Sequence, residues 1–156
     1  MRRKRHKKQN TKPDPMYQSL LVEKITNYIM FDGKKSTARR VMQKTFDEIA
    51  KARKGEDVLA VLDTAIKNAS PAIEVRPRRV GGATYQIPRE VSADRRLSLS
   101  LRWIIGAARA KKGKPMADRL AEEILLAAKN EGAAIKKKQD THRMAEANRA
   151  FAHFAW

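Results

Sequence analysis

The chain has 156 residues, of which 35 are Lys or Arg and 17 are Asp or Glu, so its formal net charge is +18. This length suits one domain with a sizeable core, and a hydrophobic content of 42% excludes a wholly disordered chain. The absence of cysteine excludes disulfides, a thiol nucleophile and Cys-ligated metal sites. A surface with this much positive charge repels itself and favours a polyanionic partner.

No stretch of the sequence has the pattern of a membrane span or a signal peptide. The basic N-terminal residues precede only a short apolar stretch, Leu20-Leu21-Val22. No run approaches the roughly 18 apolar residues that a spanning helix needs. We therefore expect no membrane partner.

Residues 1–13 form a basic arm. They contain no acid and seven cations, which are Arg2, Arg3, Lys4, Arg5, Lys7, Lys8 and Lys12. Like charges at this density cannot pack together, so we expect the arm to be disordered in the free protein. It is either a solubilising tail or a nucleic-acid contact, and the overall charge favours the contact.

Apolar periodicity predicts six helices in residues 14–156, which we interpret as one helical domain. The predicted helices run from Asp14-Pro15 to about 30, from about 35 to 54, from 58 to 69, from 93 to about 112, from 115 to about 129, and from about 133 to 148. Asp14-Pro15 is either a turn or the start of the first helix, and Pro115 is predicted to open the fifth helix. Asp57 and Ser92 are predicted caps, and Gly55 suits a left-handed position after the second helix. The aromatic tail, residues 150–156, has no predicted structure.

Residues 72–89, AIEVRPRRVGGATYQIPR, are predicted to form a β-hairpin between the third and fourth helices. Gly81-Gly82 suits a two-residue turn, in which both central residues need positive φ. Val80 then faces Ala83. In this register Pro77 and Pro88 fall in non-hydrogen-bonded pairs, which tolerate a missing N–H.

The sequence of this hairpin predicts an RNA-binding ribbon. Strand alternation puts Arg76, Arg78, Tyr85 and Arg89 on one face, with Arg79 on the other. Arginine grips phosphate in pairs, and arginine or tyrosine stacks on bases. The alternative is a hairpin packed on the core, but the ribbon lacks an uncharged inner face. We therefore expect it to contribute little to the core.

The fourth predicted helix carries a basic side. Arg95, Arg102 and Arg109 recur every seven residues, so they lie on one side of the helix, and Arg96 is offset by one. Alone, this pattern is typical of a solvated helix face. Because the base of the hairpin must lie near Ser92, we interpret the four arginines as a continuation of the RNA-binding surface.

Two lysine segments are weaker candidates for RNA contact. Lys34 and Lys35 follow Gly33 at a predicted helix start, where backbone N–H groups can hold a phosphate. Lys136 and Lys137 belong to a lysine run that suits a solvated surface as well as an RNA contact.

No arrangement of residues predicts catalysis. His6, His142 and His153 have no partners at metal-ligand spacing. Glu122-Glu123 are adjacent on a predicted helix, so we expect their side chains to point to different sides. A nucleophile elbow and a dinucleotide fingerprint are both missing from the sequence. We expect no enzyme activity, cofactor, metal or small-molecule substrate.

Together these motifs resemble the bacterial-type small-subunit ribosomal protein seven family. The similarity covers essentially the whole chain and is most specific in EVRPRRVGGATYQIP at 74–88 and DTHRMAEANRAF at 140–151. The resemblance agrees with a mainly α fold of six helices with a protruding two-stranded β-ribbon. It implies direct binding of small-subunit ribosomal RNA, nucleation of the head of the subunit, and a cytoplasmic location in the small ribosomal subunit.

The resemblance also implies partners. The ribbon of this family reaches the subunit interface beside the exit-site transfer RNA and near messenger RNA, and the family touches small-subunit ribosomal proteins nine and eleven. Arg89 departs from the family, which more often has an apolar residue after Pro88; we expect Arg89 to pair with Glu74 or to meet RNA.

Three other classes remain as alternatives. One is a basic DNA- or RNA-compacting protein outside the ribosome, which would favour duplex DNA. Another is an RNA-modifying enzyme, which would need a cofactor loop or an acid–base pair. The last is a membrane-surface protein, which would bind anionic vesicles even in excess RNA.

Overall fold

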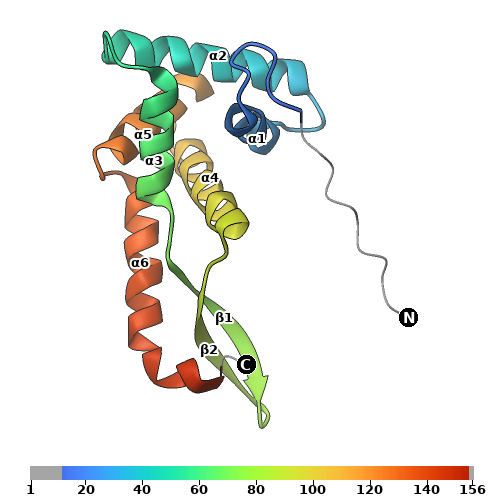
Figure 1. Ribbon diagram of the computed structural model, residues 1–156, viewed down its shortest axis with the longest axis vertical. Coiled ribbons are helices and arrows are strands. Elements are labelled where there is room, and N and C mark those ends of the chain that lie inside the picture. Colours follow the sequence, from blue (N-terminus) through green and yellow to red (C-terminus); the bar gives the residue numbers. More distant parts are fainter. Residues whose placement is uncertain (1–11, 155–156) are drawn as a thin grey trace. The chain divides into compact units, whose positions relative to one another are not determined.

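The computed structural model describes residues 12–154, which form six α-helices, one 3₁₀ helix and a two-stranded antiparallel sheet (Figure 1). The element order is α1 (Leu20–Ile29), α2 (Lys35–Ala52), α3 (Val58–Ala69), β1 (Ile73–Val80), β2 (Ala83–Glu90), α4 (Ala93–Ala110), α5 (Met116–Ala128), α6 (Ala133–Ala147) and η1 (Arg149–Phe154). The predicted helical class with a hairpin between the third and fourth helices is confirmed. The part of the basic arm from Arg2 to Lys8 lies outside the described residues.

The chain divides into two compact units, residues 1–40 and 41–156, with the boundary inside α2. The single helical domain over residues 14–156 stays a prediction. None of the helices in residues 12–154 is long and apolar enough to cross a bilayer.

In the first unit, Asp14-Pro15 is a turn, and α1 begins five residues after Pro15, at Leu20. The Asp14 carboxylate accepts hydrogen bonds from the backbone N–H groups of Met16 (3.0 Å) and Tyr17 (3.2 Å). An Asx turn of this kind competes with helix formation. The helix therefore starts only after Ser19, whose hydroxyl accepts from the backbone N–H of Val22.

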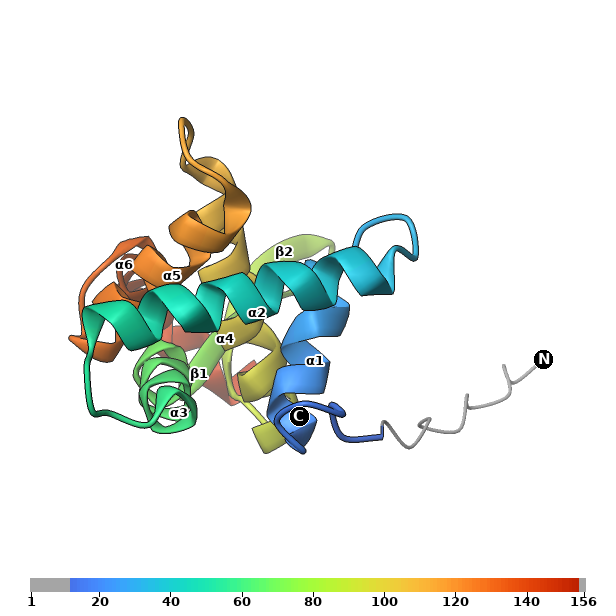
Figure 2. The same cartoon turned by 90° about the horizontal axis from the view of Figure 1, so that it is seen from above.

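In the second unit, α5 packs against both α3 and α4 (Figure 2). Each of these helices buries one apolar stripe, as expected for amphipathic helices of a globular core. The buried side chains include Leu62 and Ile66 of α3, Leu101, Ile104 and Ile105 of α4, and Leu120 and Ile124 of α5. This three-helix core supports the hairpin, which leaves it from the end of α3 and returns at the start of α4.

Two polar side chains fix the ends of these helices. The Asn68 amide of α3 donates to the carbonyls of Ala127 (2.9 Å) and Ala128 (3.1 Å) at the end of α5. Lys138 of α6 donates in turn to the carbonyl of Asn68 (2.7 Å). The last carbonyls of a helix have no i+4 donor within the helix, and these side chains supply hydrogen-bond donors to them.

Most of the predicted helix ends are confirmed. The Asp57 carboxylate accepts from the backbone N–H of Leu59 (3.0 Å), and Gly55 has φ +90°. Ser92 stands at the N-cap of α4, but its side chain makes no capping hydrogen bond. Pro115 is the N-cap residue of α5 rather than its first helical residue.

The predicted hairpin register is confirmed. Val80 faces Ala83, Pro77 faces Gln86, and Pro88 faces Val75. Gly81 and Gly82 have φ of +57° and +91°, so both turn residues use the left-handed region that glycine tolerates best.

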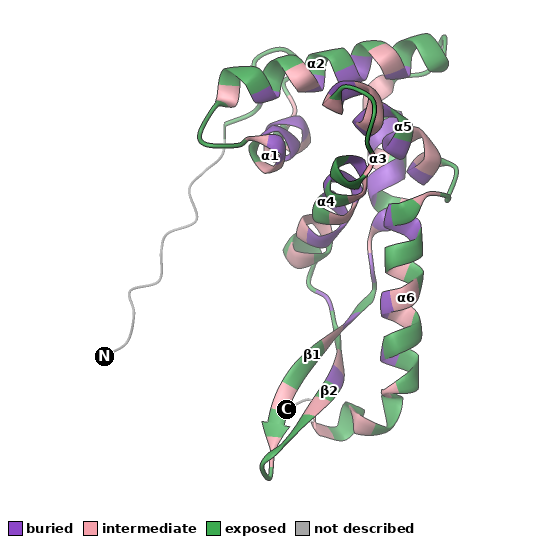
Figure 3. Cartoon of the chain, turned by 180° about the vertical axis from the view of Figure 1, so that it is seen from behind, coloured by how far each residue is buried: buried purple, intermediate pink, exposed green. Residues whose placement is uncertain are grey.

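The hairpin is not an isolated ribbon. It extends from the three-helix core beside α6, and η1 lies against β2 (Figure 3). Ile87 is only 1% exposed, and the Tyr85 ring packs against Phe151 (5.1 Å between centroids) and Phe154 (5.6 Å). The expectation that the ribbon contributes little to the core is therefore wrong. The reason is that the C-terminal tail, which has no periodic pattern, supplies the opposing apolar surface.

Candidate nucleic-acid interface

A buried carboxylate joins the hairpin to α4. Glu74, near the start of β1, is buried, and its Oε1 lies 2.5 Å from both Nε and Nη2 of Arg76. Its Oε2 accepts from Nε of Arg95 at 3.2 Å. Glu74 thus pairs with Arg76 and Arg95, while Arg89 is exposed, which leaves RNA contact as the remaining expectation for Arg89.

The arginines of α4 continue from this junction. Arg102 and Arg109 are exposed and Arg95 is half-buried, on the side of the helix away from Leu101 and Ile104. Their seven-residue spacing keeps them on one side. We call Arg76, Arg95, Arg102 and Arg109 the hairpin–α4 surface. Glu74 joins the first two, and helical spacing places the other two on the same side of α4 as Arg95.

Arg96 is exposed beside this surface, and its Nη2 donates to the Val91 carbonyl (3.4 Å). That bond holds the guanidinium near the junction between β2 and α4. Arg96 is thus held at the edge of the hairpin–α4 surface.

Side chains in the distal half of the hairpin differ in whether they are exposed for contact with RNA. Arg79 is exposed near the turn. Arg78 donates to the Phe154 carbonyl (2.7 Å), and Tyr85 is half-buried against the rings of Phe151 and Phe154. Stacking of Tyr85 on an RNA base would therefore compete with its contacts to the tail.

In the first unit, two buried carboxylates hold the basic side chains of the α2 start. Lys35 pairs with Glu23, and Arg39 lies 3.7 Å from Glu23 and 3.8 Å from Asp14. Lys35 is therefore already neutralised by an acid within the protein. Lys12 and Lys34 are exposed.

The α2 start offers fewer N–H groups to a phosphate than its sequence suggests. The backbone N–H groups of Lys34 and Lys35 donate to carbonyls of the preceding turn, at 2.9 and 2.8 Å. These two donors are engaged before any ligand arrives.

The three consecutive lysines of α6 differ in exposure and in hydrogen bonding. Lys136 and Lys137 are exposed, whereas Lys138 is half-buried and bonded to the Asn68 carbonyl. A solvated surface and an RNA contact both remain open for the first two.

Comparison with known proteins identifies the family. The sequence model of ribosomal protein S7p/S5e matches residues 1–149. The chain belongs to this family. It is 57% identical to small ribosomal subunit protein uS7 of Thermotoga petrophila and 56% identical to that of Thermotoga neapolitana, over 100% of both chains in each case. It is 56% identical to the same protein of Caldicellulosiruptor saccharolyticus over 96% of each chain.

In this family member a second buried acid, Glu123 of α5, has a different set of partners. Its Oε1 accepts from the backbone N–H of Ala134 (3.0 Å), at the start of α6, and its Oε2 lies 3.1 Å from Nζ of Lys111. Glu122 also reaches Lys111, at 3.6 Å. The expectation that the two carboxylates point to different sides is confirmed, because the Glu122 side chain is 49% exposed and that of Glu123 is fully buried.

His142 of α6 is a structural contact that its sequence context does not reveal. Its Nε2 accepts from the backbone N–H of Ala72 (3.1 Å), just before β1. Burial, and then the positive charge of Lys138, lower the pKa of His142. Both effects favour the neutral imidazole, which is the form that can accept this bond.

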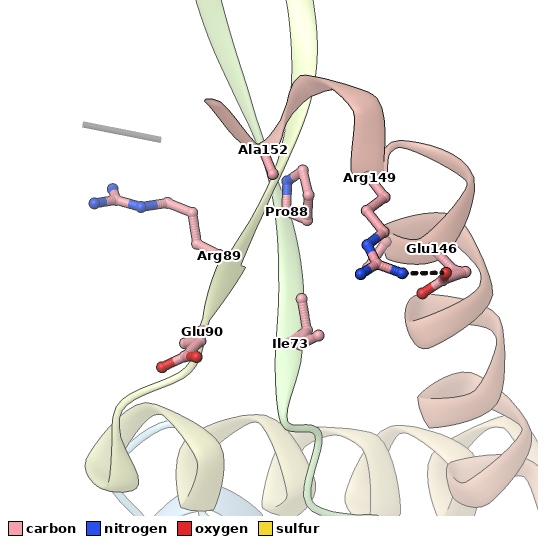
Figure 4. Close-up of a pocket in the computed structure, with 8 residues that line it drawn as sticks. Ile73, Pro88, Arg89, Glu90, Glu146, Arg149 and Ala152 are labelled. Carbon is pink, nitrogen blue, oxygen red and sulfur yellow. Dashed lines mark hydrogen bonds and ion pairs between the residues drawn. The ribbon is translucent and has the colours of Figure 1, made fainter. Parts of the chain in front are cut away.

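A cavity of about 310 Å³ lies between the base of the hairpin and the C-terminal part of the chain (Figure 4). Ile73 and Pro88 line it from the strands, and Arg149 pairs with Glu146 (3.4 Å) on its other side. Figure 4 shows the Arg89 side chain extending away from that pair. Within residues 12–154, no group of three or more acidic or His side chains could hold a metal ion.

Proposed function

We propose that this chain is a structural protein of the small ribosomal subunit and binds small-subunit ribosomal RNA through the hairpin–α4 surface. The observation that carries the proposal is the Glu74 junction, which aligns arginines from two elements into one basic surface. Membership of the S7p/S5e family and the net charge of +18 support it.

The protein neutralises RNA phosphates and recognises RNA shape, and this mechanism includes no catalytic step. Basic side chains offset the repulsion between phosphates as RNA helices converge. A-form RNA hides its major groove, so the protein reads backbone shape and single-stranded elements. The basic side chains from Arg2 to Lys12 add further phosphate contacts of the same kind.

The finer parts of the proposal concern the place of the protein in the subunit. It nucleates assembly of the head, contacts small-subunit proteins nine and eleven, and acts in the cytoplasm. Its hairpin, with Arg79 exposed near the turn, reaches the exit-site transfer RNA and messenger RNA. The relatives' name, small ribosomal subunit protein, supports a place in the small subunit.

A competition filter-binding assay tests the proposal. The full chain is titrated with purified small-subunit ribosomal RNA, with duplex DNA as competitor, over a series of salt concentrations. We expect RNA to be preferred and the affinity to fall steeply with salt. Equal binding of duplex DNA would instead support a nucleic-acid-compacting protein.

Variants of α4 localise the contact. Arg102→Gln with Arg109→Gln should weaken RNA binding and reduce the salt slope by roughly 1.4–1.8, from about 0.7–0.9 per phosphate contact. The control is Lys51→Gln with Lys67→Gln, which removes the same charge from exposed positions that pair with acids on their own helices. Equal losses in both double variants would show that only net charge matters.

A further inference from the structure

An acid in the middle of an RNA-binding surface needs a physical explanation. Glu74 is surrounded by arginines, and its negative charge opposes the approach of RNA phosphates. Yet its side chain is only 9% exposed, whereas those of Arg76 and Arg95 are 52% and 39% exposed. The carboxylate therefore acts from beneath the surface, and the guanidinium groups face the solvent.

We infer that Glu74 is a positioning residue that holds Arg76 and Arg95 as a preformed clamp for one RNA phosphodiester. This inference rests on the proposed function. The two arginines come from β1 and α4, and Glu74 is the one residue that pairs with both among those the structure describes.

The bonding pattern leaves donors for such a ligand. Glu74 engages Nε and Nη2 of Arg76 but only Nε of Arg95. Within residues 12–154, Nη1 of Arg76 and both terminal nitrogens of Arg95 have no other partner. Guanidinium groups bind phosphate oxygens in paired hydrogen bonds, so these nitrogens suit a phosphodiester.

The charge balance agrees with a single phosphate. Two arginines and one glutamate carry a net charge of +1, and a phosphodiester brings the sum to zero. Because the carboxylate orders both long side chains before RNA arrives, less rotamer entropy is lost on binding. Preorganisation therefore outweighs the repulsion between Glu74 and the RNA.

The experiment uses Glu74→Gln in the full chain, because net charge and preorganisation predict opposite results for it. The substitution removes a negative charge, which alone would tighten RNA binding. A glutamine amide cannot accept bonds on both sides, so one arginine loses its support. We expect affinity for purified small-subunit ribosomal RNA to fall by about fivefold or more.

The matched control is Glu90→Gln. Glu90 is exposed at the end of β2, close to the same junction, and its substitution changes the net charge equally. We expect its affinity to stay unchanged or to rise. Equal or tighter binding by Glu74→Gln would overturn the positioning role.

A double-mutant cycle separates positioning from a loss of folding. In the background Arg76→Gln with Arg95→Gln, Glu74→Gln should have no further effect on RNA affinity, because the side chains through which it acts are gone. If it weakens binding by the same factor there, its effect comes through the fold, and the inference is wrong. Thermal unfolding of each variant is recorded alongside.

The same cycle separates this inference from the proposed function. If Arg76→Gln with Arg95→Gln binds RNA like the unmodified chain, these two arginines are not part of the RNA-binding surface. If that double variant binds weakly while Glu74→Gln binds tightly, only the role of Glu74 fails.

Discussion

The base of the hairpin and the junction between α5 and α6 each contain a buried glutamate, yet the two acids serve different ends. Glu123 supports the fold, because its partners are a backbone N–H at the start of α6 and Lys111, whose side chain is 28% exposed. Glu74 instead holds two arginines whose side chains are 52% and 39% exposed. The role of a buried acid therefore depends on its partners: a backbone N–H and a mostly buried lysine for Glu123, and two more exposed arginines for Glu74.

The largest effect is expected at Glu123. Glu123→Ala leaves the Ala134 N–H without its acceptor and removes the buried partner of Lys111, so it should lower the free energy of unfolding by about 2–4 kcal/mol. Urea denaturation followed by circular dichroism measures this loss. Glu122→Ala is the control, because that side chain is 49% exposed, and it should change stability by less than about 0.5 kcal/mol. Equal losses of stability in the two variants would contradict a special role of the buried Glu123 in the fold.

Gly132 tests the same junction from the backbone side. It has φ +96°, and a Cβ atom there would lie 2.9 Å from Oε1 of Glu123 and 3.1 Å from Cβ of Leu126. Gly132→Ala should therefore cost about 1–3 kcal/mol of stability. Gly106→Ala is a suitable control, since its added Cβ meets no atom within 4 Å. A stable Gly132→Ala variant would contradict the tight packing around Glu123.

The tail contact tests how firmly the hairpin is held. Phe151→Ala removes one ring from Tyr85 and should cost about 0.5–1.5 kcal/mol beyond the lost burial. Hydrogen exchange should rise in the amides of β1 and β2 while the core of α3, α4 and α5 stays protected. Thr84→Ala, at an exposed position of β2, is the control. Unchanged exchange in the hairpin would mean that the tail does not restrain it.

The smallest effect is expected at His142. Because the folded protein lowers the pKa of His142 below its ordinary value of 6.5, the unfolded chain binds a proton more readily. The free energy of folding that comes from keeping His142 neutral is therefore fully present above about pH 6.5. It is lost as the pH falls through the lowered pKa of His142 in the folded state. Melting temperatures recorded from pH 7.5 to 5 should fall more for the unmodified chain than for His142→Gln. Parallel curves would contradict a lowered pKa for His142 in the folded protein.

Regular features of this chain are predictable from its sequence, because they depend on local rules. Helix periodicity marks the six helices, and the Gly81-Gly82 turn fixes the strand pairing, since a shift by one residue would exchange the two faces. The sequence leaves Asp14-Pro15 open between a turn and a helix start, and the Asp14 hydrogen bonds decide for the turn.

The candidate site is only partly predictable for a different reason. Arginine spacing indicates which side chains share a face of a helix or strand. No periodic pattern predicts which basic residue a given acid pairs with. Glu74 and Arg95 are 21 positions apart, and Arg78 and Phe154 are 76 apart. Contacts over such separations depend on how the helices pack, so the Glu74 junction and the covered face of the hairpin emerge only in three dimensions.

Nucleotide-resolution crosslinking of the full chain in cell extract shows directly which surface contacts RNA and which RNA it contacts. We expect peptides that contain Arg76 and the arginines of α4 to crosslink to small-subunit ribosomal RNA. Peptides from the exposed side of α3, which carries Lys67, should crosslink far less. Crosslinks from the hairpin–α4 surface to DNA or to unrelated RNAs would contradict ribosomal RNA binding by this surface. Ribosomal RNA crosslinks confined to other surfaces would contradict it too.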